Sequence, residues 1–232
     1  MKLLALESSA KAASVAVTED GRLIGQYWLN CGLTHSRTLL RMAESLLDDA
    51  GLSVRDLGAA AVAIGPGSFT GVRIGVATVK GLAFGKGKPC AGVSTLEALA
   101  ENLAFLSDGL ICPVMNARRN QVYTALFRGK NRLLPDQAIS VAELEEVLSG
   151  YSEPVWFVGD GYELVTSQIK HVYHPLPERL RLQSAASVAS VAMRYAKEGN
   201  TTDDARLFPV YLRPSQAERT RAEALKARED HQ

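Results

Sequence analysis

The residues of this sequence that could handle a phosphate begin with Glu7, Ser8 and Ser9, which end an apolar segment. A carboxylate there could hold metal-bound water, and the two hydroxyl groups could line a phosphate turn. Such chemistry would need a second carboxylate at the matching place in the other half of the chain, where the sequence has Asn116. A neutral amide does not supply the charge that Mg²⁺-assisted phosphoryl transfer requires. The sequence therefore favours a simpler interpretation of Glu7, a polar strand end at the surface.

A glycine-rich stretch at residues 65–75, Gly-Pro-Gly-Ser-Phe-Thr-Gly-Val-Arg-Ile-Gly, is the second candidate for ligand binding. It precedes a helix predicted over 70–85, and helix N-termini favour anions. The stretch lacks the Gly-Lys-Ser/Thr ending of a P-loop, and Thr70 stands where a dinucleotide-binding loop needs its third glycine. A nucleophile elbow around Ser68 would need glycine at positions 66 and 70. The pattern favours a structural turn, with Thr70 as the helix cap.

Four glycines occur in the predicted helix: Gly71, Gly75, Gly81 and Gly85. Each costs about 1 kcal/mol relative to alanine in a helix interior, so we expect close backbone packing to compensate for them. Only Arg73 and Lys80 interrupt the apolar surface of this helix before Lys86. A helix that is apolar nearly all round is either buried or in contact with another protein.

Histidine positions give no metal site. His35 begins a helix predicted over 36–50, but a second ligand four residues on would have to replace Leu39. His171 and His174 lie in a predicted loop without a cluster of carboxylates or cysteines around them.

Three charged residues at predicted turns leave two interpretations open. Asp160 lies between two glycines and could approach a ligand, although a turn stabilised by its own side chain is favoured. Arg118 and Arg119 could meet an anion or a partner carboxylate, or belong to a solvated turn.

The composition is that of a globular protein of 232 residues with a net charge of +1 and 47% hydrophobic residues. This balance gives no strong case for direct binding of nucleic acid. The longest charge-free run, 57–72, is shorter than a membrane span, and the apolar run after Lys2 is too short for a signal peptide. Three widely spaced cysteines, Cys31, Cys90 and Cys112, indicate reduced thiols in a cytoplasmic protein.

The order of predicted elements indicates an α/β fold. Strands are expected over 3–7, 13–18, 23–29, 59–64 and 89–93, with helices over 36–50, 70–85 and 95–106. Three hairpin-linked strands followed by alternating helices and strands form the unit βββαβαβα of the ribonuclease-H-like fold, which actin-like ATPases and sugar kinases share. A weaker repeat follows, with strands over 110–115, 121–128 and 155–158, helices over 141–148 and 184–197, and an extended segment over 209–212.

This order predicts three parts. Residues 1–108 form an N-terminal actin-like lobe and residues 109–213 a degenerate C-terminal lobe. Residues 214–232 form a charge-dense tail that is expected to be flexible.

The glycine-rich stretch resembles the signature of the bacterial TsaB (YeaZ) family. Shorter matches occur in the family's order: Leu4-Ala5-Leu6-Glu7-Ser8-Ser9, Thr34-His35-Ser36, Gly92-Val93-Ser94-Thr95-Leu96, Ala117-Arg118-Arg119 and Pro209-Val210-Tyr211-Leu212-Arg213. The resemblance covers most of residues 1–128. The chain departs from the family at Asn116, where aspartate is usual, and at Glu7, where aspartate is frequent.

The resemblance implies a protein without catalysis of its own. TsaB-like proteins pair with TsaD, which transfers a threonylcarbamoyl group to adenosine 37 of tRNAs reading ANN codons; the ATPase TsaE joins the complex and TsaC makes the donor. Self-association in the absence of TsaD, indirect contact with tRNA, no membrane and no cofactor are also implied, and a nucleotide at the shared interface stays open. Two alternatives remain: an active actin-like ATPase or kinase, and a peptidase acting on its partner.

The partner surface is predicted on the helices over 36–50 and 70–85, which have more apolar surface than one sheet face needs. The expected contact residues are His35, Leu39, Met42, Ala43, Leu46, Gly71, Val72, Gly75, Val76 and Val79.

Overall fold

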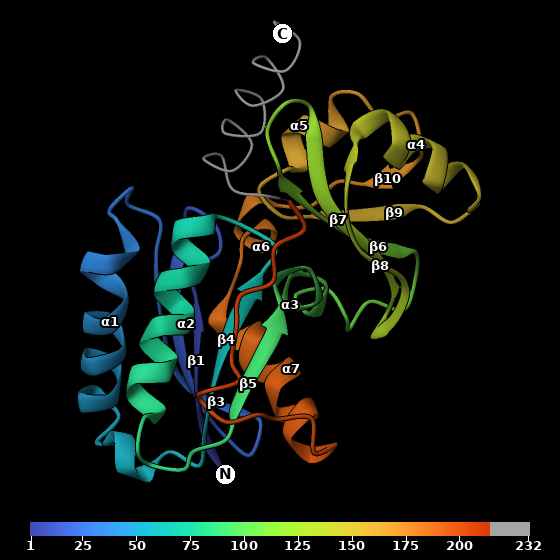
Figure 1. Ribbon diagram of the computed structural model, residues 1–232. Helices are drawn as coiled ribbons and strands as arrows, with labels where there is room; N and C mark the ends of the chain where they lie inside the picture. The colour runs from blue at the N-terminus through green and yellow to red at the C-terminus, as the bar shows by residue number, and fades with distance from the viewer. Residues whose placement is uncertain (214–232) are drawn as a thin grey trace, which may run out of the picture.

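The computed structural model describes residues 1–213, so the predicted tail at 214–232 lies outside the described residues. Two five-stranded sheets form the framework of two lobes (Figure 1). The first sheet has the order β3-β2-β1-β4-β5. Its strands are β1 (Lys2–Glu7), β2 (Ala13–Glu19), β3 (Arg22–Leu29), β4 (Ala59–Gly65) and β5 (Cys90–Ser94). β1 is antiparallel to β2 and parallel to β4, as the predicted order of elements requires.

Helices cover both faces of the first sheet. On one face lie α1 (His35–Asp49) and α2 (Phe69–Ala83), side by side (Figure 1). Their inner residues form one hydrophobic core with β1, β2 and β4. On the other face the sheet presents mostly alanine, including Ala5, Ala61 and Ala91, against α7 (Ala185–Lys197). These small side chains let the helix approach the sheet closely.

The second sheet repeats the first. Its order is β8-β7-β6-β9-β10, and β6 is antiparallel to β7 and parallel to β9, as β1 is to β2 and β4. The strands are β6 (Leu110–Asn116), β7 (Gln121–Arg128), β8 (Asn131–Ser140), β9 (Val155–Val158) and β10 (Tyr173–His174). The shorter helices are α4 (Val141–Ser149), α5 (Tyr162–Thr166) and α6 (Glu178–Arg181). The predicted α/β fold with a degenerate second repeat is confirmed.

The two repeats exchange their last helices, which corrects the expected lobe boundary. α3 (Thr95–Glu101) follows the first sheet but packs its leucines into the core of the second, while α7 packs on the first sheet. Thr202 then pairs with Cys90 on β5. Residues 185–213, which the sequence analysis assigned to the C-terminal lobe, therefore lie mostly on the first sheet.

Other differences concern short elements. β8, α5, α6 and β10 were not predicted, and α3 ends at Glu101 instead of extending to 106. The segment 209–212 contacts the carboxyl end of β4 through one backbone bond, from the Val210 N–H to the Ile64 carbonyl at 2.7 Å, without forming a regular strand. Among residues 1–213, none of the helices is long and apolar enough to cross a membrane.

Candidate functional site

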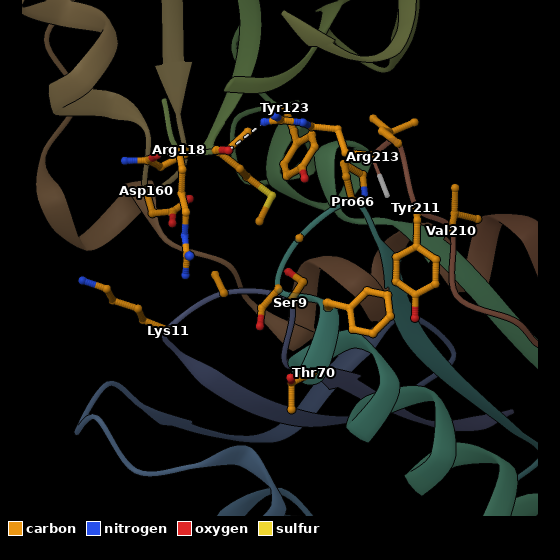
Figure 2. A pocket seen from close by; sticks show the side chains of 18 residues that line it. Ser9, Lys11, Pro66, Thr70, Arg118, Tyr123, Asp160, Val210, Tyr211 and Arg213 are labelled. Atoms are coloured by element: carbon orange, nitrogen blue, oxygen red, sulfur yellow. Dashed lines mark hydrogen bonds between the residues drawn. The ribbon is translucent and has the colours of Figure 1, made fainter. Parts of the chain in front are cut away.

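A cleft of about 440 Å³ opens between the two lobes (Figure 2). Five chain segments line it: the turn after β1, the turn before α2, the β6–β7 turn with its flanking strand residues, Asp160 after β9, and residues 210–213. The glycine-rich stretch therefore meets the predicted turns of Arg118 and Asp160 at one place. This is expected, because the equivalent strand ends of two repeated lobes face each other.

Glu7, Ser8 and Ser9 lie beneath this cleft and are fully buried, which corrects their interpretation as a surface strand end. The Ser9 N–H donates to Glu7 Oε1 at 2.6 Å, and the Ser8 hydroxyl donates to the Gly71 carbonyl at 2.9 Å. Within the described residues, Glu7 Oε2 has no hydrogen-bond partner. Burial raises the pKa of Glu7 from 4.5 to about 7, against the opposing effect of the Ser9 hydrogen bonds. Glu7 is thus a buried acid beneath the cleft that ionises only near neutral pH.

The turn before α2 packs directly on the β1 turn. The Ser68 N–H donates to the Ser9 carbonyl at 2.6 Å, and the Ser68 hydroxyl accepts from the Gly71 N–H at 3.3 Å. Ser68, and not the predicted Thr70, therefore caps α2, because the helix begins one residue earlier than expected.

The glycines of α2 divide into two groups. A Cβ on Gly71 would lie 2.1 Å from the Ser8 carbonyl oxygen, and one on Gly75 would lie 2.5 Å from Ser8 Oγ, so close packing compensates for both. A Cβ on Gly81 would meet nothing within 4 Å, and Gly85 lies beyond the helix end with φ +66. The expectation of close packing is wrong for Gly81 and Gly85.

On the second lobe, Asn116 ends β6 at the place that matches Glu7 on β1. Its exposed side chain accepts from the Arg118 N–H at 2.8 Å. Three consecutive residues, Arg118, Arg119 and Asn120, have positive φ values of 63, 54 and 57. Residues with a Cβ adopt this region rarely, so the turn has a specifically fixed conformation.

Asp160 is the one acidic residue among those that line the cleft. Loss of hydration raises its pKa, although the backbone N–H groups of Asn116 and of Asp160 itself act in the opposite direction. Asp160 therefore faces the cleft, and its position could not be read from the Gly-Asp-Gly sequence alone.

Residues 209–213, which we call the strap, join the two lobes at the cleft. Tyr211 stacks on Phe69 of α2 with ring centroids 4.7 Å apart, and Arg73 donates to the Tyr211 hydroxyl at 2.8 Å. The Arg213 guanidinium donates to the Ala117 carbonyl of the second lobe at 2.9 Å, as the dashed line in Figure 2 shows. The sequence predicted an extended segment over 209–212 and a family match at Pro209–Arg213, but neither revealed the link between the lobes.

Most of the residues predicted for the partner surface face inward. Nine are buried in the chain's own structure: Leu39, Met42, Ala43, Leu46, Gly71, Val72, Gly75, Val76 and Val79. The tenth, His35, is half-buried, with Nε2 2.7 Å from the Ala10 carbonyl. The first sheet itself accounts for this apolar surface, which corrects the physical reason for assigning these residues to a partner.

The remaining candidates do not converge on the cleft. His174 stacks on Trp156, and His171 Nε2 lies 3.0 Å from the Glu153 carbonyl. In the part of the chain that the structure describes, there is no group of three or more His, Cys, Asp or Glu side chains able to hold a metal.

Comparisons with known proteins agree with this architecture. A family model described as "TsaD: tRNA N6-adenosine threonylcarbamoyltransferase" matches residues 31–221. The tRNA threonylcarbamoyladenosine biosynthesis protein TsaB of Bacillus subtilis is 35% identical over 94% of this chain and 96% of its own length. The structure of YeaZ from Pseudomonas aeruginosa superposes with a TM-score of 0.80 at 28% identity, covering 91% of this chain and 99% of that one.

A more distant likeness concerns the fold alone. The activator of 2-hydroxyisocaproyl-CoA dehydratase from Clostridium difficile has a TM-score of 0.52 at 12% identity, covering 86% of this chain and 97% of that one. The two-lobed α/β structure is the actin-like ATPase fold. A TsaB relative is matched over nearly the full length of both proteins, and a family model spans most of the residues of this chain. The chain therefore belongs to the TsaB (YeaZ) family of tRNA threonylcarbamoyladenosine biosynthesis proteins.

Proposed function

We propose that this chain is a non-catalytic scaffold subunit required for threonylcarbamoylation of adenosine 37 in tRNAs reading ANN codons. In the cytoplasm it forms a heterodimer with a TsaD-like protein and recruits a TsaE-like ATPase, and alone it forms a homodimer. Its contact with tRNA is made through the complex.

The composition of the cleft is the observation that carries this proposal. Phosphoryl transfer with Mg²⁺ uses ionised carboxylates that face the phosphates. Here Glu7 is buried with a pKa raised to about 7, and Asn116 occupies the equivalent position on the second sheet. This arrangement supports a subunit that assists the transferase and performs no phosphoryl transfer itself.

The outer face of α1 and α2 is the surface that we propose for the partner. Leu40 is 45% exposed on α1, and Phe84, which follows α2, is 74% exposed. Gly81 of α2 is also exposed, and no contact within the described residues requires a glycine there. A glycine that weakens a helix without an internal contact is consistent with the close approach of a second helix.

Reconstitution tests the proposal. Purified TsaC-, TsaD- and TsaE-like proteins, ATP, threonine, bicarbonate and tRNA should give modified nucleoside, measured by mass spectrometry, only when this chain is present. Gly81→Gln should lower the yield and the capture of the TsaD-like protein, because the new side chain blocks the helix approach. Ala142→Gln, an exposed position on α4, is the matched control and should leave both unchanged.

Two results would contradict the proposal. Equal product without this chain would remove the scaffold role. Magnesium-dependent ATP hydrolysis by the purified chain, well above a mock preparation, would favour the alternative of an active ATPase.

A further inference from the structure

We propose that a cluster of ionised and hydrogen-bonded side chains around Glu97 is an interlobe latch, which holds the two lobes at one relative orientation and whose release lets them rotate. The residues of the latch are Ser94, Glu97, Arg132, Asp136, Arg194 and Tyr195. The proposal goes beyond the scaffold role and does not depend on it.

Two passages of the chain between the lobes provide the points about which the lobes can turn. Ser94 ends β5 of the first sheet, and Thr95 begins α3, whose leucines pack in the core of the second lobe. The chain returns at Ser184, which caps α7 on the first sheet. Hinges between domains are formed by a few residues at the ends of elements, and both passages are of this kind. Without further contacts, rotation about them would change the orientation of the lobes.

Polar side chains join α3 to α7, which lie side by side (Figure 1). The Arg194 guanidinium donates to Glu97 Oε1 at 2.6 Å, and the Tyr195 hydroxyl donates to Glu97 Oε2 at 2.8 Å. One turn further along α3, Glu101 accepts from the Ser190 hydroxyl at 2.7 Å. Because α3 is part of the second core and α7 packs on the first sheet, each of these bonds connects the two lobes.

The other half of the latch connects β8 to the first sheet. Arg132 of β8 donates to Glu97 Oε2 at 3.0 Å and forms an ion pair with Asp136. The Arg132 guanidinium also lies over the ring of the fully buried Phe127, 4.6 Å from its centroid. Asp136 Oδ2 in turn accepts from the Ser94 hydroxyl at 2.5 Å. The bonds therefore run from α7 through α3 and β8 back to β5, around the first passage of the chain.

Glu97 is the centre of the latch and stays ionised in it. Its side chain is 16% exposed. Burial acts to raise its pKa, but hydrogen bonds from Tyr195, Arg132 and Arg194 outweigh burial and hold the pKa below its ordinary value. Rotation of the lobes would separate this carboxylate from its partners while it is still shielded from water, which is unfavourable. The cluster therefore favours the one orientation in which all its bonds are made.

Pulsed electron paramagnetic resonance on the full-length chain tests the latch by measuring a distance between the lobes. Nitroxide labels are attached at Arg22→Cys on β3 and at Ala142→Cys on α4, two exposed positions, in a Cys31→Ser background. Cys90 and Cys112 are buried and stay unlabelled. Dilution with unlabelled chain removes distances between copies. With the latch intact, we expect one narrow distribution of distances.

Two substitutions open the latch from different sides. Glu97→Gln leaves one acceptor oxygen, which cannot serve Arg194 and Arg132 together. Arg132→Met removes the bonds to β8 and keeps an apolar side chain of similar length. In each variant we expect a second distance with a population of roughly 10% or more, because a minor orientation of the lobes becomes accessible. Arg128→Met is the matched control: its ion pair with Glu153 lies within the second lobe, so its distribution should match the wild type.

Three results would overturn the proposal. A broad or double distribution in the wild type would mean that the lobes already rotate. An unchanged distribution in either latch variant, with a native near-UV circular dichroism spectrum, would mean that the cluster does not set the orientation. Equal broadening in Arg128→Met would mean that loss of any ion pair has this effect. Arg132→Met leaves Glu97 with both of its α7 partners, so it decides the outcome if Glu97→Gln does not fold.

Discussion

Glu7 is a carboxylic acid that the fold keeps out of water. It ends β1, where the equivalent residue of an active phosphoryl-transfer protein would face the ligand, yet its side chain is fully buried and accepts from the Ser9 N–H. Because burial disfavours the charged form, the pKa of Glu7 is raised from 4.5 to about 7. At the scale of single residues, the site has retained the carboxyl group but buried it and made it harder to ionise.

The titration of Glu7 predicts a specific pH dependence. Its pKa is raised from 4.5 to about 7 on folding, so the folded state binds the proton more tightly than the unfolded chain does. The free energy of unfolding therefore loses about 3 kcal/mol from this group as the pH rises from 4.5 to 7. Glu7→Gln keeps an acceptor for the Ser9 N–H and removes the titration.

The measurement is urea denaturation of wild type and variant at several pH values. Relative to the wild type, the Glu7→Gln variant should gain about 3 kcal/mol of stability between pH 4.5 and pH 7, and little below or above that window. Glu44→Gln, on the exposed side of α1, is the control and should show no such gain. A constant difference across the window would mean that Glu7 ionises normally in the folded protein.

At the scale of elements, the glycines of α2 differ in whether they are packed against another part of the chain. Gly71 and Gly75 allow the helix to lie against the β1 turn, and this close packing positions the helix N-terminus at the cleft. Gly81 has no such neighbour. A periodic pattern of glycines therefore indicates close packing only where the structure supplies a second surface.

The same substitution at two of these glycines should have opposite effects. Gly75→Ala places a Cβ against Ser8 Oγ and Val62, and we expect it to lower the free energy of unfolding by about 1–3 kcal/mol. Gly81→Ala meets open space and should raise it by up to about 1 kcal/mol, because alanine is the better helix former. Thermal and chemical denaturation measure both. A destabilised Gly81→Ala would show that this position is packed inside the chain.

Elements with a strong periodic signal could be predicted from sequence, and short ones could not. The predicted hairpin of strands β2 and β3, which turns at Asp20 and Gly21, and helices α1, α2, α4 and α7 follow from local rules, because each repeats its pattern over several turns or marks its ends. β8 contains Pro135 and Asp136 within a half-buried edge strand, so its pattern resembles a loop. α5 and α6 span five and four residues, too few for a helical period.

The parts of the site that were missed depend on contacts between distant segments. Burial of Glu7 requires α2 to cover the β1 turn, and the exchange of α3 and α7 requires both sheets to be present. Local patterns contain no information on either. The family motifs identified which segments matter, and tertiary packing decided whether their side chains face the cleft, the core or solvent.

At the scale of the whole molecule, two similar lobes are joined on more than one side. Glu97 of α3 accepts from Arg132 on β8 and from Arg194 and Tyr195 on α7, which connects the second sheet to both exchanged helices. The strap connects the lobes at the cleft, and in Figure 1 the chain after α7 runs past α2 and β4 to reach the second lobe. A segment that follows the last helix therefore contacts both walls of the cleft.

Removing the hydrogen bond between the strap and the second lobe should make the β6–β7 turn open more often without unfolding the molecule. Arg213→Met keeps an apolar side chain of similar length and removes the donor to the Ala117 carbonyl. We expect faster hydrogen exchange in the β6–β7 turn at 116–121, because local opening needs fewer broken contacts, while the buried strand β1 exchanges as in the wild type. Arg206→Met, an exposed residue whose ion pair is with Asp203, is the matched control and should leave the turn unchanged. Hydrogen-exchange mass spectrometry resolves these peptides. Equal protection of the turn in both variants would show that the strap lies across the cleft without coupling the lobes, and faster exchange throughout the chain would show instead that the strap supports the global fold.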